Sequence, residues 1–312
     1  MTPFAADVLQ GLSAQPKKLS SKWFYDERGD ELFQAIMASP EYYLTNAERE
    51  IFRQQADRFY ASTGEAAFDL VELGAGDGTK TQYLVEYFLA QQADFRYLPI
   101  DISQHALDEL SGLVKRRWPD LNFAGVEGDY FEALANLPKS DTPRLKMVLF
   151  PGANIGNFSP AYARQFLNRL RQKMAIGDLL VIGFDLKKDP ARILAAYNDK
   201  AGHTRDFNLN LLRRINRELD ADFDLEQWMH WPTYDPVSGA ARSFLVSKIA
   251  QTVHIPALEQ AFHFAASEAI DMEISQKYSL AEIEALAEHT GFVVSQHLTD
   301  QAGDFVDSIW RV

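Results

Sequence analysis

One stretch, residues 69–81, constrains the fold more than any other, and it reads DLVELGAGDGTKT. Its first part, Asp69–Leu73, is a mostly apolar run that is typical of a buried strand. Three glycines follow at every second position, and residues 81–89 then repeat apolar side chains at helical spacing. Glycines let the backbone approach a ligand closely, and a helix N-terminus presents free N–H groups. The segment therefore predicts a strand–turn–helix ligand site. The alternative is a tight turn that binds nothing.

The segments that follow alternate between strands and helices. The predicted strands are Asp69–Leu73, Phe95–Ile100, Leu121–Val126, Lys146–Phe150 and Asp178–Phe184. The predicted helices between them are Thr81–Gln91, Ala106–Arg117 (capped by Ser103) and Pro160–Met174. This alternation is typical of a doubly wound, Rossmann-like α/β fold with a parallel sheet covered on both faces. Ligands bind beyond the carboxyl ends of such strands. The polar residues at those ends are Gly74, Asp101, Asp129, Asn157 and Asp185.

The pattern changes on both sides of this alternation. Residues 1–59 look helical, with a helix at Ala47–Tyr60 that Thr45 or Asn46 caps. After Lys187 the predicted elements are helices at Pro190–Asp199 and Asn208–Leu219, then strands at Ser243–Gln251, Gln251–Ile255 and Ala269–Lys277. Next come a helix at Ser279–His289, which Gly291 ends, and a C-terminal antiparallel strand pair at Phe292–Leu298 and Phe305–Arg311. We therefore expect an α/β ligand-binding domain at 47–187 and 277–312. A second, α+β domain is expected at 1–46 and 188–276.

Composition excludes several classes of partner. A net charge of −13 disfavours a nucleic-acid backbone, which needs clustered Lys and Arg. The chain has no cysteine, and its seven histidines lack metal-ligand spacing, so we expect no metal site. The longest apolar run, Leu179–Phe184, is too short to span a membrane. We expect a soluble, cytoplasmic monomer that acts on a small molecule.

Two acids follow the glycine loop at successive strand ends. Asp101 is placed to accept hydrogen bonds from ribose hydroxyls, and Asp129 to accept one from an adenine amine. The loop spacing is G-x-G-x-G, which weakens a dinucleotide interpretation. A glycine loop followed by two such acids is commoner in S-adenosylmethionine (SAM) sites than in NAD sites. The alternative is that both acids only cap helices.

The chain resembles the histidine-specific SAM-dependent methyltransferases, the family of the enzyme that forms trimethylhistidine (hercynine) for ergothioneine. The resemblance covers almost the whole chain. It is carried by the stretches KWFYDERGDELFQAI, PEYYLTNAERE, VELGAGDGTKT, PIDIS, GDY, GANIGN, DLKKDPARILAAYND, FNLNLLRRINRELDADFD, QTVHIP and MEISQKY. It implies a SAM methyltransferase sheet, a substrate domain, SAM as cofactor and methylation of the α-amino group of L-histidine.

The resemblance also implies roles for individual residues. The expected cofactor contacts are Gly74, Lys80, Asp101, Asp129 and Tyr130. The expected amino-acid pocket is lined by Tyr25, Tyr42, Asn157, Tyr197, Phe207, Glu273 and Ser275. Asn157 and Tyr197 would hold the α-carboxylate and amine, and Glu273 and Ser275 the imidazole. Asn157 and Tyr25 are the expected catalytic residues, with Tyr25 or a water taking the ammonium proton.

Four places depart from the family pattern. Asp77-Gly78 lies in a loop that is more Ser- and Glu-like in the family, and Tyr130 stands where the family often has Phe. Ala153-Asn154 replace small hydroxyl residues, and Ser243 stands where the ergothioneine enzyme has a bulkier apolar residue. Two alternative functions are methylation of another amino acid or small amine, and SAM binding without catalysis. A carboxylate at Glu273 with a hydroxyl at Ser275 favours an imidazole-bearing substrate over the first alternative.

Overall fold

The structure is a computed structural model that describes residues 1–76 and 78–312, so Asp77 of the glycine loop lies outside the described residues. The chain forms two compact units. The first comprises Met1–Tyr43 and Lys187–Gln276, and the second comprises Leu44–Leu186 and Lys277–Val312.

The second unit is built on a seven-stranded sheet with the order β11-β12-β5-β4-β1-β2-β3. Its strands are β1 (Phe68–Leu73), β2 (Phe95–Asp101), β3 (Val126–Glu127), β4 (Leu145–Phe150), β5 (Leu179–Asp185), β11 (Val293–Thr299) and β12 (Phe305–Arg311). Strands β3, β2, β1, β4 and β5 run parallel, whereas β12 is antiparallel to β5 and β11 is antiparallel to β12. This arrangement confirms the predicted doubly wound sheet with a C-terminal antiparallel pair.

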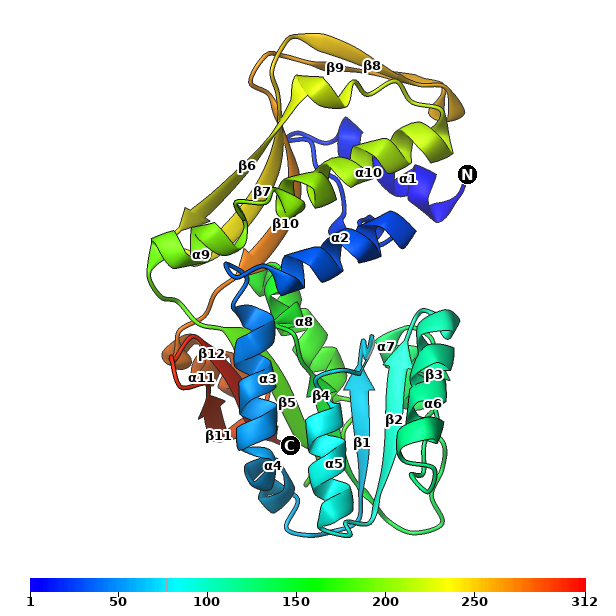
Figure 1. The fold of residues 1–312 in the computed structure, drawn as a ribbon, viewed down its shortest axis with the longest axis vertical. Helices are drawn as coiled ribbons and strands as arrows, with labels where there is room; N and C mark the ends of the chain where they lie inside the picture. Colours follow the sequence, from blue (N-terminus) through cyan, green and yellow to red (C-terminus); the bar gives the residue numbers. More distant parts are fainter. Residues whose placement is uncertain (77) are drawn as a thin grey trace. The chain divides into compact units, whose positions relative to one another are not determined.

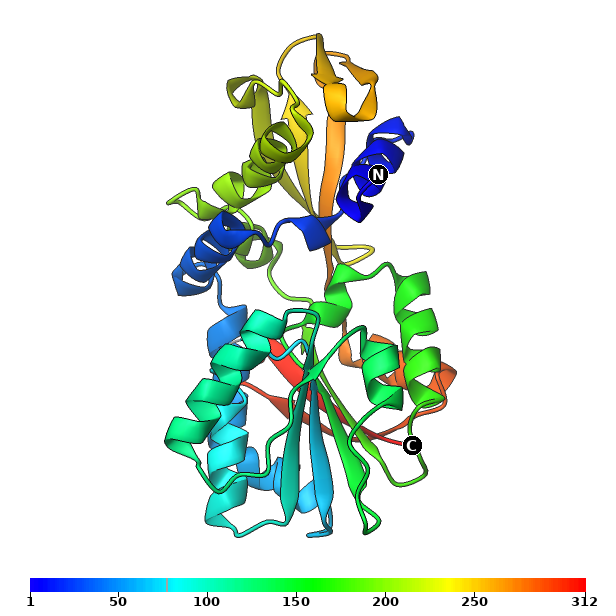
Figure 2. The same cartoon turned by 90° about the vertical axis from the view of Figure 1, so that its right-hand side faces the viewer.

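Helices cover both faces of this sheet (Figures 1 and 2). One face carries α3 (Leu44–Gln54), α4 (Ala56–Ser62), α5 (Gln82–Ala90) and α6 (Gln104–Arg117). The other face carries α7 (Tyr130–Ala135), α8 (Pro160–Arg171) and α11 (Leu280–His289), and its core includes Val71, Phe150, Phe166 and Trp310. Coverage on both sides explains why β1 and β5 are buried along their whole length and read as apolar runs.

The first unit packs helices against a small antiparallel sheet. Its helices are α1 (Pro3–Ser13), α2 (Glu27–Ala38), α9 (Pro190–Ala196) and α10 (His203–Leu219). Strands β10 (Ala269–Gln276), β7 (Ala240–Ser247) and β6 (Trp228–Asp235) form one sheet, and β8 (Gln251–Ile255) and β9 (Gln260–Phe264) form a hairpin. Apolar side chains from α1, α2, α10 and these strands share one core. This unit is the α+β structure that the sequence predicts.

Several predicted elements differ from the structure in the second unit. The strand predicted at Leu121–Val126 is reduced to the two-residue β3, because only Val126 and Glu127 pair with β2. The helix predicted at Ala47–Tyr60 is two helices that break at Gln55, which has φ −125° and ψ 21°. Helix α3 begins at Leu44, so neither Thr45 nor Asn46 is its N-cap.

The first unit contains two strands that were not expected, β6 and β9. Strand β6 is an edge strand that carries Pro232 and is mostly accessible, so it lacks the apolar alternation of a half-buried strand. The strand predicted at Ser243–Gln251 corresponds to β7, but its predicted end is wrong, because β7 ends at Ser247 and β8 begins at Gln251. Helix α10 begins five residues before the predicted Asn208, at His203.

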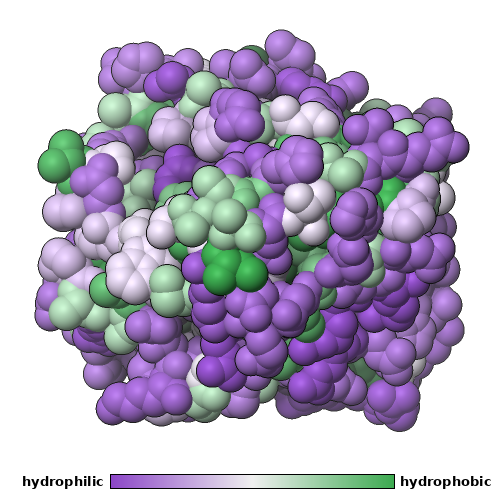
Figure 3. All heavy atoms as spheres, turned by 90° about the horizontal axis from the view of Figure 1, so that it is seen from above, coloured by the Kyte–Doolittle hydropathy of each residue, from purple (hydrophilic) through white to green (hydrophobic). Residues whose placement is uncertain are grey.

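Two predicted helix boundaries are confirmed. The Ser103 side chain accepts a hydrogen bond from the Ala106 amide at 3.2 Å, which caps α6. Gly291 follows α11 with φ +78°, the left-handed conformation that ends many helices. Within residues 1–76 and 78–312, no helix is both long and apolar enough to cross a bilayer. The face in Figure 3 is mainly hydrophilic, with small hydrophobic patches between charged side chains.

Candidate active site

Gly74 follows β1 and leads into the glycine loop. Its φ of +71° is a left-handed conformation that disfavours other residues, and its amide donates to the Ile100 carbonyl at 2.8 Å. A Cβ added to Gly74 would lie 2.9 Å from the Tyr130 hydroxyl oxygen, whereas one added to Gly76 would meet no described residue within 4 Å. The loop backbone is thus pressed against Tyr130 at one end and open at Gly76.

Asp101 and Asp129 each use one carboxylate oxygen locally. Asp101 accepts the Ser103 amide at 2.9 Å, and Asp129 caps α7 by accepting the Phe131 amide at 3.0 Å. Among the described residues, the other oxygen of Asp101 receives a long bond from the Gly76 amide, at 3.4 Å. Capping therefore accounts for part of each carboxylate's role and leaves acceptor capacity at the sheet edge. Burial, then the charges of these two carboxylates, raise the pKa of Tyr130 to about 12, so its hydroxyl stays a donor.

Lys80 comes directly after the glycine loop and pairs with the carboxylate of Glu48 from α3. Burial alone would lower the pKa of Lys80, but the Glu48 carboxylate outweighs this effect and leaves the pKa raised. A Cβ added to Gly152, in the turn after β4, would lie 3.4 Å from the Lys80 nitrogen. The ammonium is therefore charged and lies between the glycine loop and the β4 turn.

Asn157 ends that same turn. The turn begins at Pro151, passes through the left-handed residues Gly152 and Ala153, and continues as the 3-10 helix η2 (Asn154–Asn157). Asn154 donates to the Pro151 carbonyl at 2.9 Å, which closes the turn. Asn157 itself is exposed at the carboxyl end of the sheet.

A second buried carboxyl, Glu72 of β1, lies beneath the loop and accepts hydrogen bonds from Thr81 and Tyr97. Burial raises its pKa from 4.5 to about 7, against the effect of these bonds. Between about pH 4.5 and pH 7, Glu72 therefore keeps its proton in the folded protein but loses it in the unfolded chain. Stability from this group is greatest below about pH 4.5 and declines as the pH rises to about 7.

Glu72→Gln is expected to remove this pH dependence. Relative to the variant, the wild type should lose about 2.5 kcal/mol of unfolding free energy between pH 5 and pH 8, because this window covers most of a pKa rise of about 2.5 units at about 1.36 kcal/mol each. Urea unfolding of both proteins at the two pH values measures the difference. The exposed Glu132→Gln variant is the control, and an equal pH response in all three proteins would contradict the assignment.

The amino-acid residues predicted in the first unit cluster around aromatic rings. The Phe33 ring lies 5.5 Å from that of Tyr25, 6.4 Å from that of Tyr42 and 5.8 Å from that of Phe207. Tyr25 and Phe207 also contact each other at 5.5 Å. Three of the predicted residues thus share one aromatic cluster. Phe33 joins them and was missed, although its place in the FYDERGDELF stretch could have identified it.

Polar residues of β10, and Tyr197 at the end of α9, adjoin this cluster. Tyr197 donates its hydroxyl hydrogen to the Ser275 side chain at 2.7 Å. Glu273 and Ser275 lie two apart in an unbroken register against β7, so both side chains share one face of the sheet. Burial and then the charge of Glu273 raise the pKa of Tyr25 above its usual value. Because Tyr25 is 46% accessible, it is crowded without being sealed from water.

His230 is a further residue of this region, for which the sequence pattern indicates only the absence of metal-ligand spacing. Its Nε2 lies 3.1 Å from the Tyr197 carbonyl oxygen, which can only accept, so this nitrogen carries the hydrogen. Burial lowers the pKa of the His230 imidazole, which keeps the ring neutral. A neutral His230 thus holds the backbone of Tyr197 in place.

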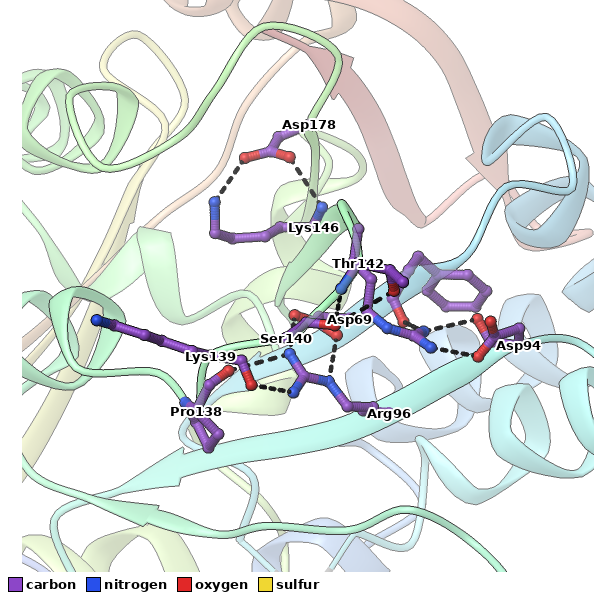
Figure 4. Close-up of polar contacts among 11 residues, drawn as sticks. Asp69, Asp94, Arg96, Pro138, Lys139, Ser140, Thr142, Lys146 and Asp178 are labelled. Atoms are coloured by element: carbon purple, nitrogen blue, oxygen red, sulfur yellow. Dashed lines mark hydrogen bonds and ion pairs between the residues drawn. The ribbon is translucent and has the colours of Figure 1, made fainter.

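A hollow of about 320 Å³ lies at the amino ends of β1, β2 and β4, at the other edge of the sheet from Gly74 and Asp101 (Figure 4). Arg96 donates to both carboxylate oxygens of Asp69 at 2.7 and 2.6 Å, and Lys146 pairs with Asp178 at 3.1 Å. Arg144 pairs with one carboxylate oxygen of Asp94 and also donates to the Asp94 backbone carbonyl at 3.1 Å. These cations are neutralised by protein carboxylates, so the hollow is better explained by structure than by anion binding. Among the described residues, no group of three His, Asp or Glu side chains is arranged to hold a metal ion.

A solved SAM-dependent methyltransferase from Clostridium acetobutylicum has the same fold, with a TM-score of 0.50 and 10% identity over 91% of this chain and 98% of that one. A family model described as histidine-specific methyltransferase, SAM-dependent, matches residues 4–312. The chain belongs to this family of histidine-specific, SAM-dependent methyltransferases. The predicted family, enzyme class and cofactor are thereby confirmed.

Two curated relatives cover nearly the whole chain. The chain is 36% identical over 299 residues to the histidine N-alpha-methyltransferase of Mycolicibacterium smegmatis, covering 96% of this chain and 92% of that protein. It has the same identity and coverage with the histidine N-alpha-methyltransferase of Mycobacterium tuberculosis.

Proposed function

We propose that the protein transfers methyl groups from SAM to the α-amino nitrogen of L-histidine, and successively to the methylated products up to trimethylhistidine. Family membership over residues 4–312 is the observation that carries this proposal. The names of the two mycobacterial relatives support the choice of the α-amine. The alternative substrates are another amino acid or a small amine.

The residues at the carboxyl edge of the sheet fit SAM. Gly74 keeps the backbone close to Tyr130, and the loop is open at Gly76, where a Cβ would meet no described residue. Asp101 retains acceptor capacity for a ribose diol, and Asp129 for the adenine amine. We place Lys80, whose ammonium pairs with Glu48, beside the bound cofactor. SAM, when bound, supplies a methyl group activated by the positive charge on sulfur.

Different substrate residues bind different parts of the histidine molecule. In this proposal, Glu273 and Ser275 hold the imidazole, while Asn157 and Tyr197 hold the α-carboxylate and amine. The Tyr197 hydroxyl already donates to Ser275, so it fixes the orientation of the serine that faces the ring. A carboxylate at Glu273 favours a ring that donates N–H hydrogen bonds. An imidazole has two ring nitrogens for Glu273 and Ser275, whereas an indole has one and an aliphatic side chain has none.

The reaction needs a neutral amine aligned with the methyl group and shielded from water. The raised pKa of Tyr25 keeps its phenol protonated, which makes it a poor acceptor for the ammonium proton. We therefore assign Tyr25 to orienting the amine through a hydrogen bond, and the proton to a water molecule. Tyr42 and Phe207 complete the apolar side of the pocket through their contacts with Phe33.

Methyl transfer measured with a panel of amino acids tests the function. We expect the wild-type protein with SAM to methylate L-histidine and its α-N-methyl forms, with mass spectrometry counting the methyl groups. Histidine with an acetylated α-amine is the matched control and should be inert, because its nitrogen lone pair is delocalised. Equal turnover of leucine or tryptophan, or methylation of the acetylated substrate, would contradict the proposal.

The proposal extends to the setting of the enzyme. We infer a monomer that acts in the cytoplasm, without nucleic-acid or membrane partners. The net charge of −13 supports the absence of nucleic-acid binding, because phosphate backbones repel such a surface.

A further inference from the structure

Glu48 is a buried carboxylate that the proposed reaction does not use. It lies on α3, is 0% exposed, and belongs to the same unit as the glycine loop (Figure 1). One of its oxygens pairs with the Lys80 ammonium. The other accepts the amide hydrogen of Gly152 at 2.6 Å. A single carboxylate is therefore bonded to the loop assigned to the cofactor and to the turn that ends in Asn157.

The surroundings of Glu48 are shaped to accommodate it. A Cβ added to Gly183 of β5 would lie 2.5 Å from a Glu48 oxygen, so only a glycine there leaves room for the carboxylate. Gly183 pairs with Asp307 of β12, another fully buried carboxyl whose two oxygens lack hydrogen-bond partners among the described residues. Burial and then the charge of Glu48 raise the pKa of Asp307 well above its usual value, against the opposing effect of the Lys80 charge.

We propose that Glu48 is a positioning residue that couples the cofactor site to the substrate site, because it holds Lys80 through one oxygen and the Gly152–Asn157 turn through the other. This inference rests on the proposed function, which assigns Lys80 to SAM and Asn157 to histidine. A ligand that fixes Lys80 also fixes the carboxylate, and through it the turn. Binding at either site should then favour binding at the other, by the same factor in both directions.

Calorimetric titration with S-adenosylhomocysteine, the demethylated cofactor, measures this coupling without turnover. For the wild type, saturating L-histidine is expected to lower the dissociation constant of S-adenosylhomocysteine about tenfold, within the usual range of coupling between sites. In Glu48→Gln the gain should fall below about twofold, because the amide group lacks the charge that holds Lys80 and has only one acceptor oxygen. A residue that supports only folding would lower thermal stability and leave this ratio unchanged.

Glu50→Gln is the matched control, since Glu50 lies on the same helix and accepts the Gln301 amide at 2.9 Å, away from the loop. It should keep the wild-type ratio. If Glu48→Gln does not fold, the double variant Glu48→Gln/Lys80→Met takes its place, because it removes both charges and leaves neither buried without a partner. This double variant should also lack coupling. A wild-type ratio in either Glu48 variant, or a wild type without coupling, overturns the inference. A wild type that methylates no histidine overturns the proposed function instead.

Discussion

Replacing Glu273 with alanine is expected to lower kcat/KM for L-histidine about 100-fold. The change leaves an imidazole N–H without its acceptor in a half-buried site, which costs roughly 2–3 kcal/mol of transition-state binding. The affinity for S-adenosylhomocysteine should stay near that of the wild type, because the cofactor residues belong to the other unit. Steady-state kinetics and calorimetric titration measure the two quantities separately.

The control for this variant is Glu31→Ala, which removes an exposed carboxylate of the same unit whose bond to Arg28 lies at the surface. It should leave kcat/KM within about twofold of the wild type, because exposed ion pairs contribute little. Glu273→Gln retains the length and one acceptor oxygen, so its activity should lie between the wild type and Glu273→Ala. Intact histidine turnover in Glu273→Ala would show that the ring is held elsewhere.

The parallel sheet can be predicted from sequence because its strands are short apolar runs that glycines and acids interrupt. Strand β1 and the C-terminal strand β12 are buried along almost their whole length, so burial and sequence carry the same signal. Strand β6 has no such signal, because it is an accessible edge strand with Pro232 in its middle. Strand β3 is too short to leave a pattern, since only two residues pair.

The cofactor residues and the substrate residues also differ in how far the sequence alone predicts them. The residues at strand ends, such as Asp101, follow from topology, because parallel strands deliver their carboxyl ends to one edge. The residues of the first unit, such as Tyr197 and Glu273, were identified only through resemblance to a family. The Glu48–Lys80 pair could not be predicted, because it joins residues 32 positions apart through the packing of α3 against the sheet. Neither side chain marks its partner in the sequence.

A second buried ion pair lies at the carboxyl end of β5. The Lys277 ammonium lies 2.6 Å from the Asp185 carboxylate, and both side chains are 0% exposed. The Tyr278 amide also donates to the Asp185 carbonyl at 3.0 Å, so the pair lies where the chain enters α11 from β10. Two charges this deeply buried stabilise the fold little as a pair, but removing one partner of such a pair is strongly destabilising.

Lys277→Met is therefore expected to lower the free energy of unfolding of the protein by about 3–5 kcal/mol, because it removes the ammonium that neutralises the Asp185 carboxylate. The double variant Lys277→Met/Asp185→Asn removes both charges and should recover part of this loss. Lys173→Met, at an exposed position after α8, is the control and should change stability by less than about 0.5 kcal/mol. Urea unfolding of the four proteins at one pH measures the differences. If the single and double variants lose the same stability, the loss comes from packing around the Lys277 stem and the charge argument is wrong.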